Sequence, residues 1–384
     1  MTLPYRRLVY ISFIVIFLII TPIVILYTTG YRYNFQTNKI QKTGILILKS
    51  NPTGAKIYLN GKLRTETTPA RIANLLPDDY DIKIEKENFH PWQKKLPVQS
   101  SLTIFAENIS LFEKLLPAKI VETNSELFSL APNKEKIIYL DKKETGGEVW
   151  LLNFRNNKNN LIYRISEDKN EIVNLEWSND NQKVLITVNF SGAAESRKYI
   201  MVNTGNGEVS VYQKLSDFYF TFRGVPINSA DAHLLPDLDV AAGYSGVVAI
   251  LDKNTKKLSV VRPPAMDVLF ETGADRMVWS SDGKKLLYTI DFEIWIYDFS
   301  AEEKKFISRY GQEIKKIDWV NENYIAALLG GAVKIMELDE RDQRNVIDII
   351  TPEEISNFFI DPAKQSIYFS GVIGNKKGVF ELPY

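Results

Sequence analysis

The segment WSSDGKKLLY, at residues 279–288, is one copy of a pattern that recurs through the C-terminal two thirds of the chain. In this pattern an apolar residue or Trp is followed by a polar turn and, seven residues on, by an apolar strand. The other copies are LAPNKEKIIY (130–139), WSNDNQKVLI (177–186), IDPAKQSIYF (360–369) and, with a shortened turn, WVNENYIAAL (319–328). Their first residues, here called the anchors, are 47, 102, 40 and 41 positions apart, so the gap of 102 predicts one further, degenerate unit.

A second pattern marks strand hairpins in the same region. Six such segments occur, and the third of them, at residues 246–253, falls in the gap. They are GEVWLLNF, RKYIMVNT, GVVAILDK, FEIWIYDF, AVKIMELD and KGVFELPY. A period of about 45 residues with several short strands is typical of a β-propeller blade, which buries both faces only by stacking around an axis. We therefore expect six blades over residues 115–384, with residues 118–123 pairing with the last blade, which ends one strand short.

These units resemble those of TolB-like and WD40-like β-propellers, over roughly residues 115–384. The resemblance implies the fold and says almost nothing about a ligand. The tryptophans of the repeat are therefore interpreted as residues that pack blades together rather than as platforms for carbohydrate.

The first thirty residues predict a membrane anchor. Residues 8–26 carry no charge, and fifteen of these nineteen are Leu, Ile, Val or Phe. Nineteen helical residues span about 29 Å, close to the hydrocarbon thickness of a bilayer. A cleaved signal peptide is the alternative, but its apolar region is normally shorter and ends in a small-x-small site, which LYTTGYRYNF does not offer. We expect residues 1–34 to form one uncleaved span with its interface.

Orientation follows less directly from charge. Arg6 and Arg7 precede the span, whereas Arg32, Lys39 and Lys42 follow it, so charge counting gives a tie. The proximity of the first pair favours retention of the N-terminus and predicts a single-pass protein of the cell membrane with its C-terminal domains on the extracytoplasmic side.

Residues 43–112 predict a small β-sandwich. NPTG reads as a turn, AKIYL alternates apolar and polar residues, and Asn60-Gly61 is the strongest short hairpin signal because a type I′ turn needs positive φ at both positions. The order of these signals resembles the PEGA domain, a small extracytoplasmic β-module. The residues that carry the motif are Pro52, Gly54, Ala55, Gly61, Thr68 and Pro69. Glu66 and Asp78-Asp79 depart from it at two loops, and the resemblance implies structural roles, not catalysis.

The expected fold class is thus an all-β soluble part, a PEGA-like sandwich plus a six-bladed propeller, after one transmembrane helix. The 47 basic and 47 acidic residues balance, which argues against nucleic acid as a partner, and no phosphate-binding glycine motif indicates a nucleotide. The chain has no Cys and two His, so we expect no metal and no cofactor. Ser245 lacks the final glycine of a nucleophile elbow and falls in a predicted strand, and Asp237 and Asp239 lack a calcium loop.

No catalytic residue is therefore expected. The preferred hypothesis is a tethered binding or scaffolding protein, not an enzyme, with the PEGA module as stalk and the propeller presenting a face to an envelope protein or glycan. The alternatives are a glycosidase- or peptidase-like propeller acting on envelope polymers, and a purely structural surface-layer or wall-attachment protein. Phe218, Tyr219 and Phe222, in the irregular stretch 216–239, are the candidate partner contacts. The alternative for that stretch is that it only packs the degenerate third blade.

Overall fold

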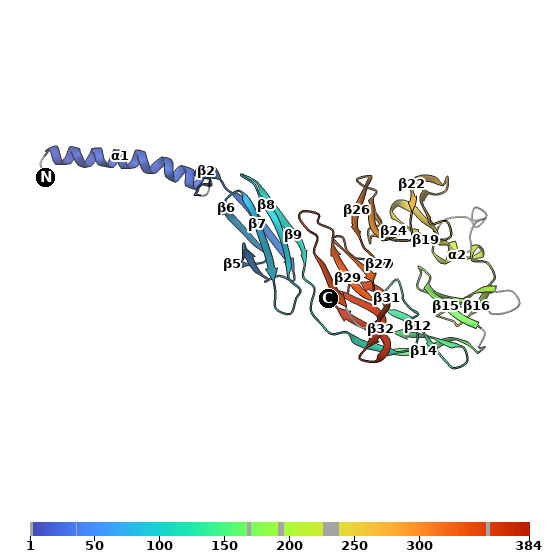
Figure 1. Cartoon of the computed structure of the whole chain (residues 1–384). Coiled ribbons are helices and arrows are strands. Elements are labelled where there is room, and N and C mark those ends of the chain that lie inside the picture. The colour runs from blue at the N-terminus through green and yellow to red at the C-terminus, as the bar shows by residue number, and fades with distance from the viewer. Residues whose placement is uncertain (1–2, 36, 167–169, 191–195, 226–237, 351–353) are drawn as a thin grey trace. The chain divides into compact units, whose positions relative to one another are not determined.

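The computed structural model of the chain describes residues 3–35, 37–166, 170–190, 196–225, 238–350 and 354–384. Its residues form two compact units. The first is Met1–Lys114 together with Asp339–Asn345, and the second is Leu115–Leu338 together with Val346–Tyr384. Apart from one long N-terminal helix and a few short helical turns, the described residues form strands, which confirms the predicted fold class (Figure 1).

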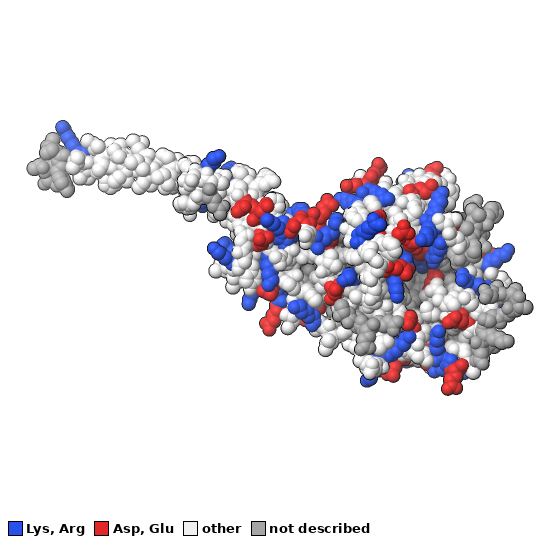
Figure 2. All heavy atoms as spheres, viewed as in Figure 1, with Lys and Arg blue, Asp and Glu red and all other residues white. Residues whose placement is uncertain are grey.

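The long helix is α1 (Leu3–Thr28), and its window Arg7–Thr28 is long and apolar enough to cross a membrane, with a mean hydropathy of 2.9. None of that window is buried against other residues. Figure 2 shows most of its length without charged side chains, in contrast to the mixed charges of the rest of the chain. The hydroxyls of Thr28 and Thr29 donate to carbonyls one turn back, which removes their need for water. The hairpin β1 (Tyr31–Asn34) and β2 (Lys39–Lys42) follows.

The first unit continues as a sandwich of two sheets. The three-stranded sheet has the order β6-β3-β9, in which β3 and β9 are parallel, and the four-stranded sheet has the order β5-β4-β7-β8. Alternate side chains of both sheets form a single core, because successive strand residues point to opposite faces. The strands are β3 (Gly44–Asn51), β4 (Lys56–Leu59), β5 (Lys62–Thr67), β6 (Ala70–Leu75), β7 (Asp78–Glu85), β8 (Trp92–Val98) and β9 (Thr103–Ser110).

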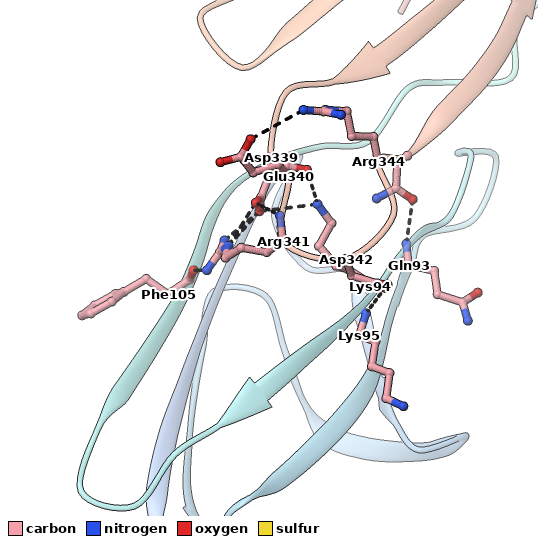
Figure 3. Close-up of polar contacts among 10 residues, drawn as sticks. Gln93, Lys94, Lys95, Phe105, Asp339, Glu340, Arg341, Asp342 and Arg344 are labelled. Carbon is pink, nitrogen blue, oxygen red and sulfur yellow. Dashed lines mark hydrogen bonds and ion pairs between the residues drawn. The ribbon is translucent and has the colours of Figure 1, made fainter. Parts of the chain in front are cut away.

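The seven residues Asp339–Asn345, which lie much later in the sequence, belong to the first unit and cover the outer edge of β8 (Figure 3). The backbone N–H groups of Gln93 and Lys95 on that edge donate to Asn345 Oδ1 (3.2 Å) and Asp342 Oδ2 (2.7 Å). Between them Lys94, whose side chain is fully buried, donates to the Asp339 carbonyl oxygen at 2.8 Å and lies 3.5 Å from its carboxylate. The segment therefore supplies acceptors to a strand edge and to a buried ammonium.

The described residues of the second unit form six four-stranded sheets, each antiparallel. The first strands contact one another in five of the six neighbouring pairs, including β11 with β31, and the second and third sheets share one hydrophobic cluster. The first three sheets are β11 (Phe128–Leu130), β12 (Lys136–Lys142), β13 (Gly147–Asn153), β14 (Lys158–Ile165); β15 (Asn170–Trp177), β16 (Lys183–Phe190), β17 (Ser196–Asn203), β18 (Val209–Tyr212); and β19 (Leu238–Ala242), β20 (Val248–Asp252), β21 (Lys257–Arg262), β22 (Asp267–Gly273).

The remaining sheets complete the propeller. They are β23 (Arg276–Trp279), β24 (Lys285–Ile290), β25 (Glu293–Asp298), β26 (Glu303–Arg309); β27 (Ile314–Asn321), β28 (Tyr324–Leu329), β29 (Ala332–Glu337), β30 (Val346–Ile350); and β31 (Glu354–Asp361), β32 (Ser366–Ile373), β33 (Lys376–Pro383), β10 (Ala118–Glu122). In the last sheet β10 pairs antiparallel with β33, so the predicted pairing of residues 118–123 with the final blade is confirmed. In the third sheet GVVAILDK forms the second strand, whereas the other five hairpin segments form the third.

The repeated tryptophans have a structural explanation. Trp177 and Trp279 end the first strands of their sheets, and Trp319 lies near the end of β27. Each indole N–H donates to a carbonyl on the first strand of the preceding sheet. The acceptors are the carbonyl oxygens of Ser129, Ala241 and Val278, at 3.0 to 3.2 Å. Each indole therefore uses its single hydrogen-bond donor in a contact between two blades, which agrees with the prediction that these tryptophans pack blades together.

Candidate functional site

A cavity of about 880 Å³ lies among the first strands of all six sheets of the propeller. The repeat explains which side chains reach it. In the five units where the sequence shows an anchor, the residue three positions before the anchor lines the cavity. In the third sheet Trp279 donates to the Ala241 carbonyl oxygen, and in other blades this acceptor comes one residue before the anchor. The anchor position of the third sheet is therefore residue 242, and the residue three positions before it is Asp239, which also lines the cavity. These six residues, here called the central ring, are Leu127, Asn174, Asp239, Arg276, Lys316 and Asn357.

Five of the six members of the central ring are polar, one from each of the second to sixth blades. Three of them, Asn174, Lys316 and Asn357, directly follow a register shift in the pairing of their strand with the next. A β-bulge of this kind bends the strand and re-aims the side chains beside it, and bulges are common next to functional sites. The same local device thus recurs at the same place in three blades.

One position before the anchors, a second set of side chains lines the same cavity. This second ring contains Ser129, Glu176, Val278, Asp318 and Phe359. With the exposed side chains at the rim, the lining includes five basic and five acidic residues, so its formal charge is zero. The basic residues are Arg223, Lys253, Arg276, Lys315 and Lys316, and the acidic ones are Glu176, Asp239, Asp275, Glu313 and Asp318.

Most of these charges are paired across neighbouring blades. Arg223 lies between two acids, 3.9 Å from Glu176 and 3.7 Å from Asp239, and its Nε donates to the Val240 carbonyl oxygen. Tyr219 donates its hydroxyl to the same Glu176 at 3.1 Å. Burial, with the negative charge of Glu176 next to it, raises the pKa of Tyr219 well above its usual value, so the phenol stays protonated and donating.

The fourth and fifth blades are joined in a similar way. Arg276 donates from Nε to the Lys315 carbonyl oxygen at 2.6 Å and from Nη2 to Glu313 at 3.2 Å. Its guanidinium is therefore already occupied by partners from the next blade.

Lys316 is placed differently. Its ammonium donates to Asn357 Oδ1 at 2.8 Å and lies 3.4 Å from the centroid of the Phe359 ring. Burial lowers its pKa to about 7, and the nearby charge of Asp318 offsets only part of that effect. Burial also raises the pKa of Asp318. This lysine is the group that sequence reasoning missed, because the sequence marks the anchors but not which position before an anchor lines the cavity.

The three residues that the sequence analysis predicted as partner contacts are buried in the structure. The exposed fractions of Phe218, Tyr219 and Phe222 are 6, 4 and 4%, and the three rings pack in one cluster with residues of the second and third sheets. This favours the packing alternative for the stretch 216–239. Tyr219 still reaches the cavity through its edge. Residues 226–237 of that stretch, with His233 and Asp237, lie outside the described residues.

The residues of the hairpin motif in the first unit form a compact turn network. The hydroxyl of the buried Thr68 shares a hydrogen bond with the Ser50 hydroxyl at 2.6 Å and accepts the backbone N–H of Ala55 at 3.0 Å. The carbonyl oxygen of Thr68 accepts the backbone N–H of Gly54 at 2.6 Å. Gly54 has a φ of +76°, in the left-handed region that glycine tolerates. The hairpin turn at residues 60–61 has positive φ at both positions, as predicted. Pro52, Gly61 and Pro69 complete this structural set.

Two further predictions concern chemistry. Ser245 lies in the short 3₁₀ turn η3 (Tyr244–Gly246) and not in a strand, so the predicted strand there is wrong. The turn forms because Ser245 and Gly246 both adopt positive φ, which ends strand geometry. Among the described residues no group of three or more His, Asp or Glu side chains is arranged to hold a metal ion.

Comparison with known proteins gives a family for the first unit. Residues 43–108 match the PEGA domain model. No curated protein matches the chain. Among solved structures, the chain is similar to a chain of the mitotic checkpoint complex (8% identity, 70% of this chain and 91% of that chain, TM-score 0.49). It is also similar to the Cps50 (Swd1) β-propeller domain of Myceliophteria thermophila (10%, 69% and 98%, 0.43) and to the β-propeller domain of the trilobed protease of Pyrococcus furiosus (13%, 88% and 92%, 0.38).

Proposed function

We propose that this chain is a membrane-tethered binding protein of the cell envelope whose partner enters the central cavity of the propeller. The observation that carries the proposal is the central ring. Positions that face a propeller axis can be filled by apolar side chains, as Leu127 is in the first blade, yet the other five blades place polar side chains there. Convergent polar side chains in a cavity give a ligand its orientation and specificity, and a ligand with matching groups can bind them.

The charge pattern restricts the partner. A lining with five basic and five acidic residues favours a ligand of mixed or low net charge, such as a segment of a protein, over a polyanion. A glycan of the envelope is the other candidate, since amide and carboxylate side chains also bind hydroxyls. In this proposal the PEGA domain is a stalk, because its motif residues are engaged in turns and offer few free side chains for recognition.

We infer binding rather than catalysis, because the described residues of the cavity lining include no histidine, and its only serine, Ser129, has no base beside it. One observation favours a second candidate, an enzyme acting on envelope polymers. An amine with a pKa near neutrality, as at Lys316, is a property of lysines that act as bases or nucleophiles. Turnover of an envelope glycan or peptide that is lost in Lys316→Gln would favour this candidate.

The binding site can be located with a photo-crosslinking amino acid placed at three positions of the full chain in its native membrane. Asn174 lies in the central ring, Val211 is exposed on the outermost strand of the second sheet, and Leu63 is exposed on the PEGA hairpin. We expect a discrete adduct from position 174 and none from the other two, because only the cavity position would face the partner. An adduct from position 63 or 211 alone would place the partner outside the cavity.

The side of the membrane is a separate prediction. With α1 as an uncleaved anchor and the basic residues before it retained, protease added to intact spheroplasts is expected to remove both folded units. Protease added after lysis should give no further loss. Full protection in intact spheroplasts would contradict the orientation, and a mature N-terminus near residue 30 would contradict the anchor.

A further inference from the structure

The ammonium of Lys316 is under-satisfied for a group at the edge of a cavity. A lysine ammonium has three donors, and the described structure gives it one acceptor, the side-chain oxygen of Asn357 at 2.8 Å. Asn357 is held in turn by the donation of its amide to the Phe128 carbonyl oxygen at 3.4 Å. The amide oxygen therefore fixes the direction of the ammonium without neutralising its charge.

Charges around Lys316 come from two elements. On its own strand Asp318 attracts the ammonium, and Lys134, in the turn after β11, repels it. From β31 the side chains that face it are neutral, namely Asn357 and the rings of Phe358 and Phe359, whose centroids lie 5.6 and 3.4 Å from Nζ. A monoanionic acceptor from outside would supply what these neighbours do not.

An apolar surface lies beside the same ammonium. Phe359 and Phe128 pack edge to face with ring centroids 5.1 Å apart, and Phe359 lines the cavity together with Leu127, the apolar member of the central ring. A ligand group that fits both features carries a carboxylate and an apolar side chain close together. The last residue of a polypeptide chain is such a group.

We propose that Lys316 binds the terminal carboxylate of a peptide segment, with Asn357 as its positioning residue and the apolar last side chain against Leu127 and Phe359. This inference rests on the proposed function and names the chemistry of the partner. A carboxylate fits better than a phosphate, because the single ammonium of Lys316 balances one negative charge, whereas the second charge of a dianion would be unbalanced beside Asp318.

Binding should depend on pH in a defined direction. In the free protein burial holds the pKa of Lys316 at about 7, and a bound carboxylate raises it, so binding takes up a proton above neutral pH. Affinity is expected to be greatest below pH 7 and to fall up to about tenfold per pH unit above it, until the pKa of the bound state is reached.

The test uses the full chain in detergent micelles and fluorescein-labelled tetrapeptide pools with random first residues and Phe or Leu last. One pool has free carboxylates and the other has carboxamides. By fluorescence polarisation at pH 6.5, the acid pool is expected to bind at least about tenfold more tightly than the amide pool, as charge-assisted hydrogen bonds require. The preference should shrink between pH 7 and 9.

Two substitutions complete the design. Lys316→Gln should reduce binding of the acid pool to the level of the amide pool. Lys158→Gln, at an exposed position on β14 outside the cavity lining, should change it less than about twofold. Both variants should keep the wild-type melting temperature. Equal binding of acid and amide pools, or an acid preference that survives Lys316→Gln, would overturn the inference. If position 174 still crosslinks to the native partner in that case, the proposed function stands and only the ligand chemistry is wrong.

Discussion

Replacement of residues 118–122 by the sequence Gly-Ser-Gly-Ser-Gly is expected to lower the melting temperature of the propeller by about 10 °C. Strand β10 supplies the outer strand of the last sheet, and Ile120 and Val121 pack against its core. Loss of these two side chains at about 1–2 kcal/mol each, together with a strand of ladder hydrogen bonds, amounts to about 4 kcal/mol. For a domain of this size each kcal/mol shifts the melting temperature by about 2–4 °C.

The replacement keeps the length of the chain, so that any loss comes from the strand itself. Its control is the pair Lys119→Gln and Glu122→Gln, which removes an exposed ion pair at 2.5 Å and leaves the strand in place. We expect the control to shift the melting temperature by no more than about 2 °C, because exposed ion pairs contribute less than about 1 kcal/mol. Near-UV circular dichroism of the full chain in detergent can follow the transition. Equal melting curves for the wild type and the Gly-Ser variant would mean that β10 does not close the propeller.

Phe222→Ala is expected to destabilise the propeller by about 3–5 kcal/mol, which is the cost of truncating a buried Phe. The ring is 4% exposed and packs against Phe218 and Tyr219, which belong to the cluster between the second and third sheets. The substitution should therefore lower the melting temperature by about 10 °C or more.

The matched control is Phe292→Ala, because Phe292 is 43% exposed in the turn between β24 and β25. We expect it to change stability by less than about 1 kcal/mol. If Phe222→Ala melts like the control but no longer crosslinks its partner from position 174, then the aromatic stretch contacts the partner and the packing interpretation is incorrect.

The sequence predicted the repeating part of the fold because its signals are local. The tryptophans at 177, 279 and 319 mark the period of the propeller directly. Outside the repeats, the turn at Asn60-Gly61 is marked in the same local way, because it needs two positive φ values. The third blade was placed less well. Its anchor position is Ala242, where the other blades have a large residue. The sequence pattern therefore groups the segment 246–253 with five other hairpin segments, although it forms the second strand of its sheet and they form the third.

The candidate site could not be found in the same way. Lys316 and Asn357 are 41 residues apart, and nothing in either neighbourhood marks them as a pair. They meet because both stand three residues before an anchor and both follow a β-bulge, and a bulge leaves no mark in a short alternating strand. Conversely, the three aromatics of the irregular stretch were conspicuous in the sequence, yet their rings fill a gap between sheets.

The segment Asp339–Asn345 has a consequence for dividing the chain. It is encoded between two propeller strands but completes the PEGA-containing unit, so the chain passes between the two units at three points and neither unit is a continuous stretch. A piece that stops at Lys114 would lack the acceptors that Gln93 and Lys95 use on the edge of β8. A strand edge with unpaired donors can form hydrogen bonds with strands of other copies. Such a piece would therefore tend to self-associate through an edge that is covered in the intact protein.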